Sequence, residues 1–130
     1  KALHYQNLTA IDTNGDGVAE LVGSYWIEVD KETRALLFFI AEKGKTGKYA
    51  FGYSDYRRVG QDGVMSGDIK DLDKGVYHEL LLDYLDVDSD GKAEIFTYTQ
   101  SFEGAGFDVY HLVGTKWTKL YSFSDYRCAF

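Results

Sequence analysis

Short stretches of apolar, aromatic and β-branched residues alternate with polar, glycine-containing turns along the chain, and this pattern predicts β-strands throughout. In the first half we expect strands at 4–11, 18–28, 35–42 and 48–54. In the second half we expect them at 78–85, 92–102, 107–113 and 116–123. The run 36–40 is continuously apolar, which indicates a strand buried on both faces, whereas 107–113 mixes apolar and polar residues and indicates a half-exposed strand.

The two halves of the chain repeat one another. His4 and His78 each stand eight positions before the first aspartate of an acidic loop, 12–20 in one half and 86–94 in the other. The sequence Ser-Asp-Tyr-Arg at 54–57 also returns at 124–127. Internal repeats of this length are typical of propellers, solenoids and arrays. We therefore expect a first repeat unit at 1–59, a linker at 60–77 and a second unit at 78–130.

The predicted fold is all-β, with two four-stranded antiparallel meanders that each resemble a propeller blade. Turns are expected at 29–33, 43–47, 103–106 and 114–115, and the last has glycine first, as a two-residue type II′ hairpin prefers. The glycine-rich, charged linker leaves room for a short strand at 64–69.

Both acidic loops carry oxygen ligands in the order that a calcium ion requires. Oxygen-bearing side chains stand at positions 1, 3 and 5, a glycine at position 6 permits the sharp turn, and position 7 can offer its carbonyl. A carboxylate at position 9 closes the shell. The predicted ligands of two Ca²⁺ ions are Asp12, Asn14, Asp16, Val18 (carbonyl) and Glu20, and Asp86, Asp88, Asp90, Lys92 (carbonyl) and Glu94.

Three other interpretations of these loops are less favoured. Asn-Gly and Asp-Gly are common in ordinary polar turns, but both copies have every alternate ligand in place. An EF-hand would need a glutamate at position 12 and a following helix, whereas position 12 is Gly23 or Thr97 and strand-forming residues follow. Magnesium is disfavoured because it prefers a stricter octahedron and retained waters.

Each acidic loop lies between two predicted strands, with an apolar residue before it and Leu-Val or Ile-Phe after it. This arrangement resembles the FG-GAP or VCBS repeat of integrin α-subunit-like β-propellers. The resemblance implies four-stranded blades and calcium bound by positions 1, 3, 5, 7 and 9. Position 9 is Glu here where the family more often has Asp, and the Phe-Gly and Gly-Ala-Pro signatures are poorly matched in a chain without proline. Two blades cannot close a ring. The chain is therefore expected to be a fragment of a longer propeller, to form an oligomeric propeller, or to pack its two sheets as a sandwich.

Charge and composition exclude several classes of function. The net charge is −7 and no Lys or Arg cluster exists, which argues against nucleic-acid binding. No apolar run approaches the roughly 20 residues that cross a bilayer, so membrane insertion is not expected. The single cysteine, Cys128, has no internal disulfide partner and leaves the redox compartment undetermined. The chain begins at Lys1 with no initiator Met or signal pattern, which suits a processed chain or a piece of a longer one.

No catalytic constellation is present, so an enzyme is not expected. His4, His78 and His111 have no accompanying cysteine cluster or HExxH motif, which favours structural or surface roles. Trp26 and Trp117 suit core packing better than stacking on sugars. The expected function is a calcium-stabilised scaffold for protein binding or adhesion, extracellular or periplasmic at the cell surface. The alternatives are a carbohydrate-binding propeller module or an accessory domain of a larger secreted enzyme. A protein or glycan ligand, further copies of the chain, or the rest of a longer chain would be its partners.

Overall fold

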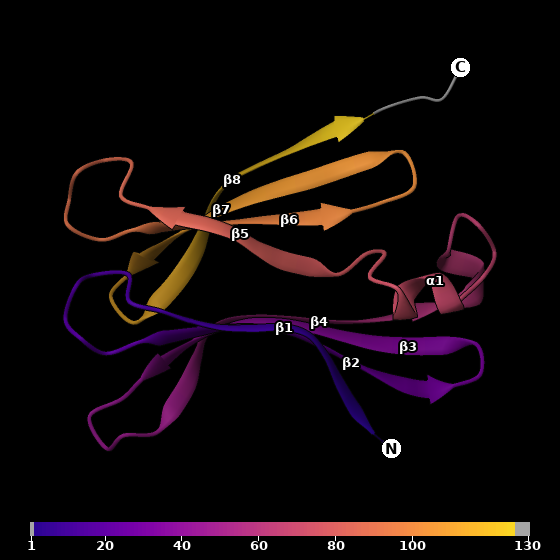
Figure 1. Cartoon of the computed structure of the whole chain (residues 1–130), viewed down its shortest axis with the longest axis horizontal. Helices are drawn as coiled ribbons and strands as arrows, with labels where there is room; N and C mark the ends of the chain where they lie inside the picture. The colour runs from indigo at the N-terminus through magenta and orange to yellow at the C-terminus, as the bar shows by residue number, and fades with distance from the viewer. Residues whose placement is uncertain (1, 127–130) are drawn as a thin grey trace.

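The computed structural model describes residues 2–126, and these form two separate antiparallel sheets, each with its four strands in chain order. Sheet 1 contains β1 (Leu3–Ile11), β2 (Glu20–Asp30), β3 (Thr33–Lys43) and β4 (Tyr49–Gly60). Sheet 2 contains β5 (Glu79–Leu85), β6 (Glu94–Gln100), β7 (Gly104–Val113) and β8 (Lys116–Tyr126). The two sheets lie one above the other as two layers (Figure 1). The predicted all-β fold with two four-stranded meanders is confirmed.

Several strand boundaries differ from the prediction because cross-strand pairing overrides local preference. β4 continues to Gly60, well beyond the expected end at 54, because it pairs with β3 along its whole length. The expected turn at 103–106 is wrong, since Gly104 already pairs with Tyr126 at the start of β7. The hairpin at 114–115 is confirmed: Val113 pairs with Lys116, and only the first of the two turn residues has a positive φ, +65°.

The main core lies between the two sheets. Each sheet turns a row of large side chains toward the other, and seven of these are no more than 4% exposed: Ile11, Val22, Phe38 and Ile40 from sheet 1, and Ile95, Tyr110 and Trp117 from sheet 2. Phe38 and Tyr110 stack with their ring centroids 5.8 Å apart across this interface. The sheets therefore form a single packed unit.

The predicted linker is docked against sheet 1. A short strand at 64–69 was expected and is not found; the segment instead contains the 3₁₀ helix η1 (Gln61–Gly63) and the helix α1 (Lys70–Asp73). It adds a second core of buried side chains: Leu36, Val64, Ile69 and Leu72. The guanidinium of Arg34 donates to both carboxylate oxygens of Asp73, at 2.7 and 3.1 Å, which fixes α1 on β3.

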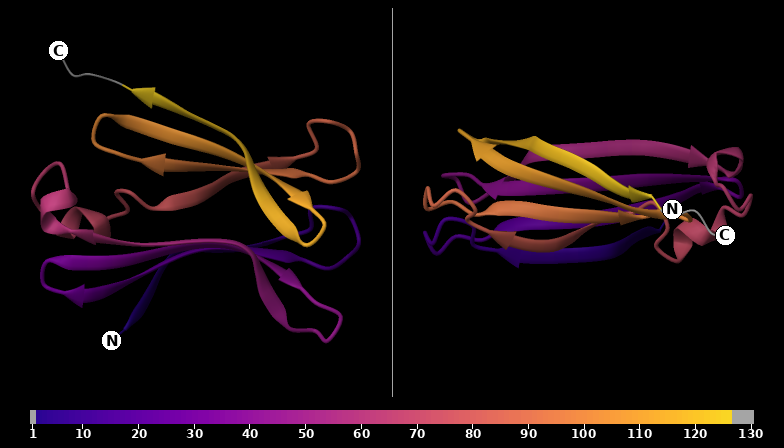
Figure 2. Two further views of the ribbon diagram at one scale, coloured as in Figure 1. Left: turned by 180° about the vertical axis from the view of Figure 1, so that it is seen from behind. Right: turned by 90° about the horizontal axis from the view of Figure 1, so that it is seen from above.

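The helix α1 lies at one end of the two layers, and the acidic loops lie at the other (Figures 1 and 2). Within the described residues no helix is long and apolar enough to span a membrane. Cys128 falls outside the described part of the chain. So does Arg127, which ends the second Ser-Asp-Tyr-Arg sequence.

Candidate metal centre

The two acidic loops lie next to each other at one end of the molecule. One connects β1 to β2 and the other connects β5 to β6, so each follows the first strand of its sheet. The amide of Ala93 donates to the carbonyl oxygen of Thr13 at 2.7 Å, which joins the second loop directly to the first. Thr13 and Ala93 are both buried, so this bond is shielded from water.

The same hydrogen bonds shape both loops. The aspartate at position 1 accepts the amide at position 6: Gly17 donates to Asp12 at 2.9 Å, and Gly91 donates to Asp86 at 2.8 Å. Such bonds curl the backbone around the position 1 carboxylate.

The later ligand positions are held in equivalent ways. At position 5, Asp16 accepts the amide of Val18 at 2.8 Å, and Asp90 accepts that of Lys92 at 2.9 Å. At position 3, Asn14 and Asp88 each accept the amide two residues further on, at 3.1 and 3.3 Å. The glutamate at position 9 accepts the amide at position 2, from Thr13 to Glu20 and from Val87 to Glu94, each at 2.9 Å. All side chains predicted as ligands therefore already have a fixed place in the loop.

The loops need left-handed backbone at positions 4 and 6. Gly17 and Gly91 have φ of +80° and +87° at position 6. At position 4 the first loop has Gly15 at +73°, but the second has Ser89 at +61°. A residue other than glycine is uncommon in this region, and the second loop accepts it to reach the same shape.

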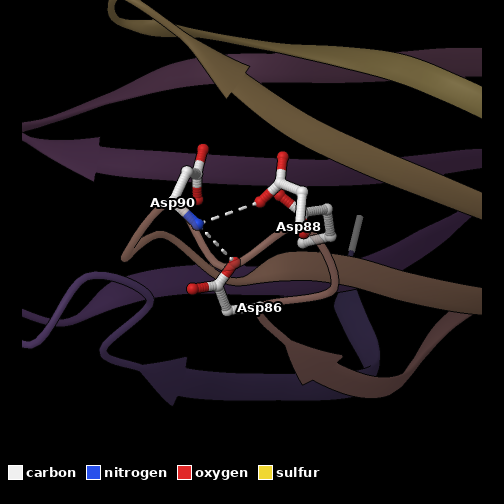
Figure 3. A group of neighbouring side chains, drawn as sticks. Asp86, Asp88 and Asp90 are labelled. Carbon is white, nitrogen blue, oxygen red and sulfur yellow. Dashed lines mark hydrogen bonds between the residues drawn. The ribbon is translucent and has the colours of Figure 1, made fainter.

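The second loop brings four carboxylates together. Asp86, Asp88, Asp90 and Glu94 can each offer one oxygen so that all four oxygens lie within 4.8 Å of one another. Figure 3 shows the first three, with the amide of Asp90 donating to Asp86 and Asp88. Glu94 is buried, and the three aspartates are exposed. A set of carboxylate oxygens this close fits a hard divalent cation.

The crowding changes how these carboxyls bind protons. Loss of hydration raises the pKa of Asp86, but hydrogen bonds with the amide of Gly91, the side chain of Asp88 and the amides of Asp90 and Ser89 outweigh it, and the net pKa is lowered. Loss of hydration and a hydrogen bond with Asp86 raise the pKa of Asp88. Neighbouring aspartates therefore influence each other's proton binding, and a bound cation would offset the repulsion between their negative charges.

The first loop is less tightly gathered. Its carboxylates form no group as close as that of the second loop among the residues that the structure describes, and position 3 supplies the neutral Asn14. Glu20 is buried and accepts from both the amide and the hydroxyl of Thr13. The equivalent residue in the second loop, Val87, has no hydroxyl. The position 9 carboxylate is therefore engaged more fully by protein groups in the first loop than in the second.

The histidines and tryptophans do not add to these sites. His4 stacks on Trp26 with ring centroids 4.3 Å apart, and His78 meets the edge of the same indole at 6.4 Å. Trp117 is 3% exposed, so the core position expected for it is confirmed. His78 is buried, and its Nε2 lies 2.6 Å from the carbonyl oxygen of Leu72.

Sequence reasoning missed a buried carboxyl group at the other end of β5. Glu79 accepts from the hydroxyls of Thr97 at 2.6 Å and Tyr110 at 2.5 Å, and burial raises the pKa of Glu79. The signal was weak, because the position equivalent to Glu79 in the first unit is Tyr5. Glu79 and its two hydroxyl donors lie at the interface between the sheets, where they form a structural polar contact.

Comparisons with protein-family models, curated proteins and solved structures gave no match. The resemblance to FG-GAP or VCBS repeats therefore stays a prediction from the loop residues. The geometry offers an acidic loop whose carboxylates fit a cation, supported by two packed sheets.

Proposed function

We propose that this chain is a non-enzymatic calcium-binding β-repeat domain in which the acidic loops hold Ca²⁺ as a structural ion. The observation that carries the proposal is the group of four carboxylates in the second loop, whose oxygens lie within 4.8 Å of one another. We assign the stronger site to this loop. The first loop offers one carboxylate fewer and is the weaker site.

The donor set supports calcium over other metals. Calcium takes six to eight oxygens at about 2.3–2.6 Å with flexible geometry, and carboxylates supply the charge. Zinc prefers nitrogen and sulfur ligands, and neither His nor Cys belongs to the group formed by Asp86, Asp88, Asp90 and Glu94. Magnesium needs a stricter octahedron at about 2.0–2.1 Å and retains several waters.

Calcium would act by fixing the turn between the first two strands of each sheet. At an affinity near 10⁻⁴ M and about 1 mM calcium, one site would add about 1.4 kcal/mol to the free energy of unfolding. A domain that uses calcium at this concentration would work outside the cytoplasm, at the cell surface or in the periplasm. There the rigid sheets would serve as a scaffold for protein binding or adhesion, a role that the loops' resemblance to FG-GAP or VCBS repeats also supports.

The test is calcium binding by calorimetry on chelator-treated protein, together with thermal unfolding in calcium and in excess chelator. Asp88→Ala should lose most of the calcium-dependent rise in melting temperature and change little in chelator. Asp83→Ala removes the same charge from an exposed position on β5, outside the group of four, and should keep the full rise. If the unaltered chain takes up no calcium and melts at the same temperature in both conditions, the proposal is wrong.

A further inference from the structure

The two sheets pack through opposite faces. In sheet 1, Val22 pairs with Ile40 and Ile40 with Tyr53, so these residues share one face, here called the V face. Leu21, Ala41 and Phe51 share the other, here called the L face. The V face of sheet 1 points into the chain, since Val22 is 1% and Ile40 0% exposed.

Sheet 2 buries the other face. Glu20 and Glu94 end equivalent loops, so Leu21 corresponds to Ile95 and Val22 to Phe96. Ile95 pairs with Tyr110, and both are 0% exposed within the core, so sheet 2 turns its L face toward sheet 1.

A shared irregularity supports this correspondence. In sheet 1 a bulge places Gly52 between the pairs Ile40–Tyr53 and Ala41–Phe51. In sheet 2 a bulge places Leu120 between the pairs Val109–Tyr121 and Tyr110–Lys119. Because both fourth strands carry the extra residue at the same distance from the loop, the faces of the two sheets can be matched position by position.

Each free face is therefore the counterpart of a face that is buried inside the chain. The free L face of sheet 1 corresponds to the buried L face of sheet 2. The free V face of sheet 2 corresponds to the buried V face of sheet 1. No other described element covers either free face. The two free faces form the outer sides of the two layers in Figure 1.

Both free faces are aromatic. On the L face of sheet 1, neighbouring rings run from Tyr5 to Tyr25, Phe39 and Phe51, with centroids 6.1, 5.8 and 4.9 Å apart. Tyr5 is 68% and Phe51 49% exposed. Gly23 lies directly beneath Phe39, since a Cβ there would stand 2.4 Å from the ring.

The V face of sheet 2 has a similar surface. Phe107 and Phe123 stack with centroids 5.1 Å apart, and Tyr121 lies 5.8 Å from Phe123. Tyr121 is 60% and Phe123 51% exposed. Extended apolar surfaces of this kind mark interaction sites on soluble domains.

We propose that the occupant of these faces is a second copy of the same chain, with the L face of its sheet 1 on the V face of sheet 2 of the first copy. The contact between chains then continues the contact within each chain. An isologous dimer would instead pair two V faces or two L faces, a combination that the chain's own interface does not use. A contact between different faces leaves one of each free on the pair, so further copies add until a ring closes or a filament grows.

Calcium does not enter this contact, because none of the aromatic residues of the two free faces lies in loops 12–20 or 86–94. The solution mass is measured by sedimentation or light scattering over a wide concentration range, in calcium and in chelator. The unaltered chain should form species above its 14.7 kDa single-chain mass. A single-chain mass at every concentration overturns the proposal.

Paired variants decide which faces meet. Tyr56→Glu alters the L face of sheet 1 and Phe123→Glu the V face of sheet 2, both at residues more than half exposed. Each variant alone should be a single chain, because both ends of the contact are needed for self-assembly. Mixed together they should form a one-to-one dimer, since each still has the face that the other has lost.

Met65→Glu is the matched control, because Met65 is 62% exposed in the segment between the sheets and belongs to neither face. It should assemble like the unaltered chain. Self-association of either face variant alone, or a mixture that stays monomeric, overturns the proposal. Circular dichroism checks the fold, and Tyr56→Ser with Phe123→Ser repeats the test if a glutamate variant unfolds.

Discussion

The backbone of Gly52 in β4 lies directly against the indole of Trp117 in β8. A Cβ on residue 52 would stand 2.9 Å from Cδ1 of Trp117 and 3.1 Å from the carbonyl oxygen of Thr115. Trp117 is 3% exposed, and its Nε1–H donates to Glu42 at 3.2 Å, so the ring cannot easily move. Close approach of the two sheets at this point therefore depends on the missing side chain.

Gly52→Ala should lower the free energy of unfolding by about 1–3 kcal/mol, the usual cost of overpacking a buried contact. Gly106→Ala is the matched control, since a Cβ there meets nothing within 4 Å. It should change stability by less than about 0.5 kcal/mol or raise it slightly. Urea unfolding measures both, and equal losses would show that the approach of Trp117 is not what residue 52 controls.

The loop backbone and the loop ligands can be separated by substitution. Gly91 has φ of +87° with open space around its Cβ position, so Gly91→Ala strains only the backbone. It should cost about 1–2 kcal/mol in calcium and in chelator alike. Ser89→Gly should cause no such loss, since glycine suits the φ of +61° there. A loss for Gly91→Ala that appears only in calcium would mean that this turn forms only around the ion.

Burial shifts the pKa values of two neighbouring residues, His78 and Glu79, in opposite directions. Burial lowers the pKa of His78 from its ordinary value of 6.5, although the carbonyl of Leu72 opposes this. Burial raises the pKa of Glu79 above its ordinary 4.5. As pH falls through 6.5, the unfolded chain gains a proton at His78 that the folded chain resists, so stability is lost. As pH rises above 4.5, the unfolded chain ionises Glu79 before the folded chain does, so stability is lost in that direction.

Two variants should separate these effects in unfolding measured from pH 4 to 8 in chelator. Relative to the unaltered chain, His78→Asn should gain stability as pH falls below 6.5. Glu79→Gln should gain stability relative to the unaltered chain as pH rises above 4.5. If the stability difference between each variant and the unaltered chain stays constant with pH, the pKa shifts of His78 and Glu79 are contradicted.

The hydroxyl of Tyr110 in β7 donates to Glu79 in β5 at 2.5 Å, on the face of sheet 2 that packs against sheet 1. Burial raises the pKa of Tyr110 well above its ordinary value of 10.0. Tyr110→Phe leaves a buried acceptor with one donor fewer and should cost about 1–3 kcal/mol. Tyr121→Phe, at a residue 60% exposed, is the control and should change stability little. Unfolding in urea with the protein kept dilute compares the two without contributions from self-association.

The sequence repeat led to a correct fold because the loops anchor the strands. Glu20 and Glu94 start β2 and β6 at equivalent positions, and the strand order follows from short connections. The Ser-Asp-Tyr-Arg repeat was less informative. Asp55 pairs with Phe38, which pairs with Ser24, four residues after Glu20. Asp125 pairs with Ala105, which pairs with Gln100, six residues after Glu94, so it stands two residue pairs further from its loop.

The residues alone therefore determined the number of strands, their meander order and the oxygen-bearing side chains that the two loops carry, because these depend on local periodicity and on spacing of a few positions. Tertiary structure decided the rest. It docked the linker through Arg34 and Asp73, and it gathered four carboxylates in one loop but not in the other. It also chose which face of each sheet is buried. Both faces carry large apolar side chains, so the face that is buried depends on how distant side chains such as Phe38 and Tyr110 fit together, which no local sequence pattern predicts.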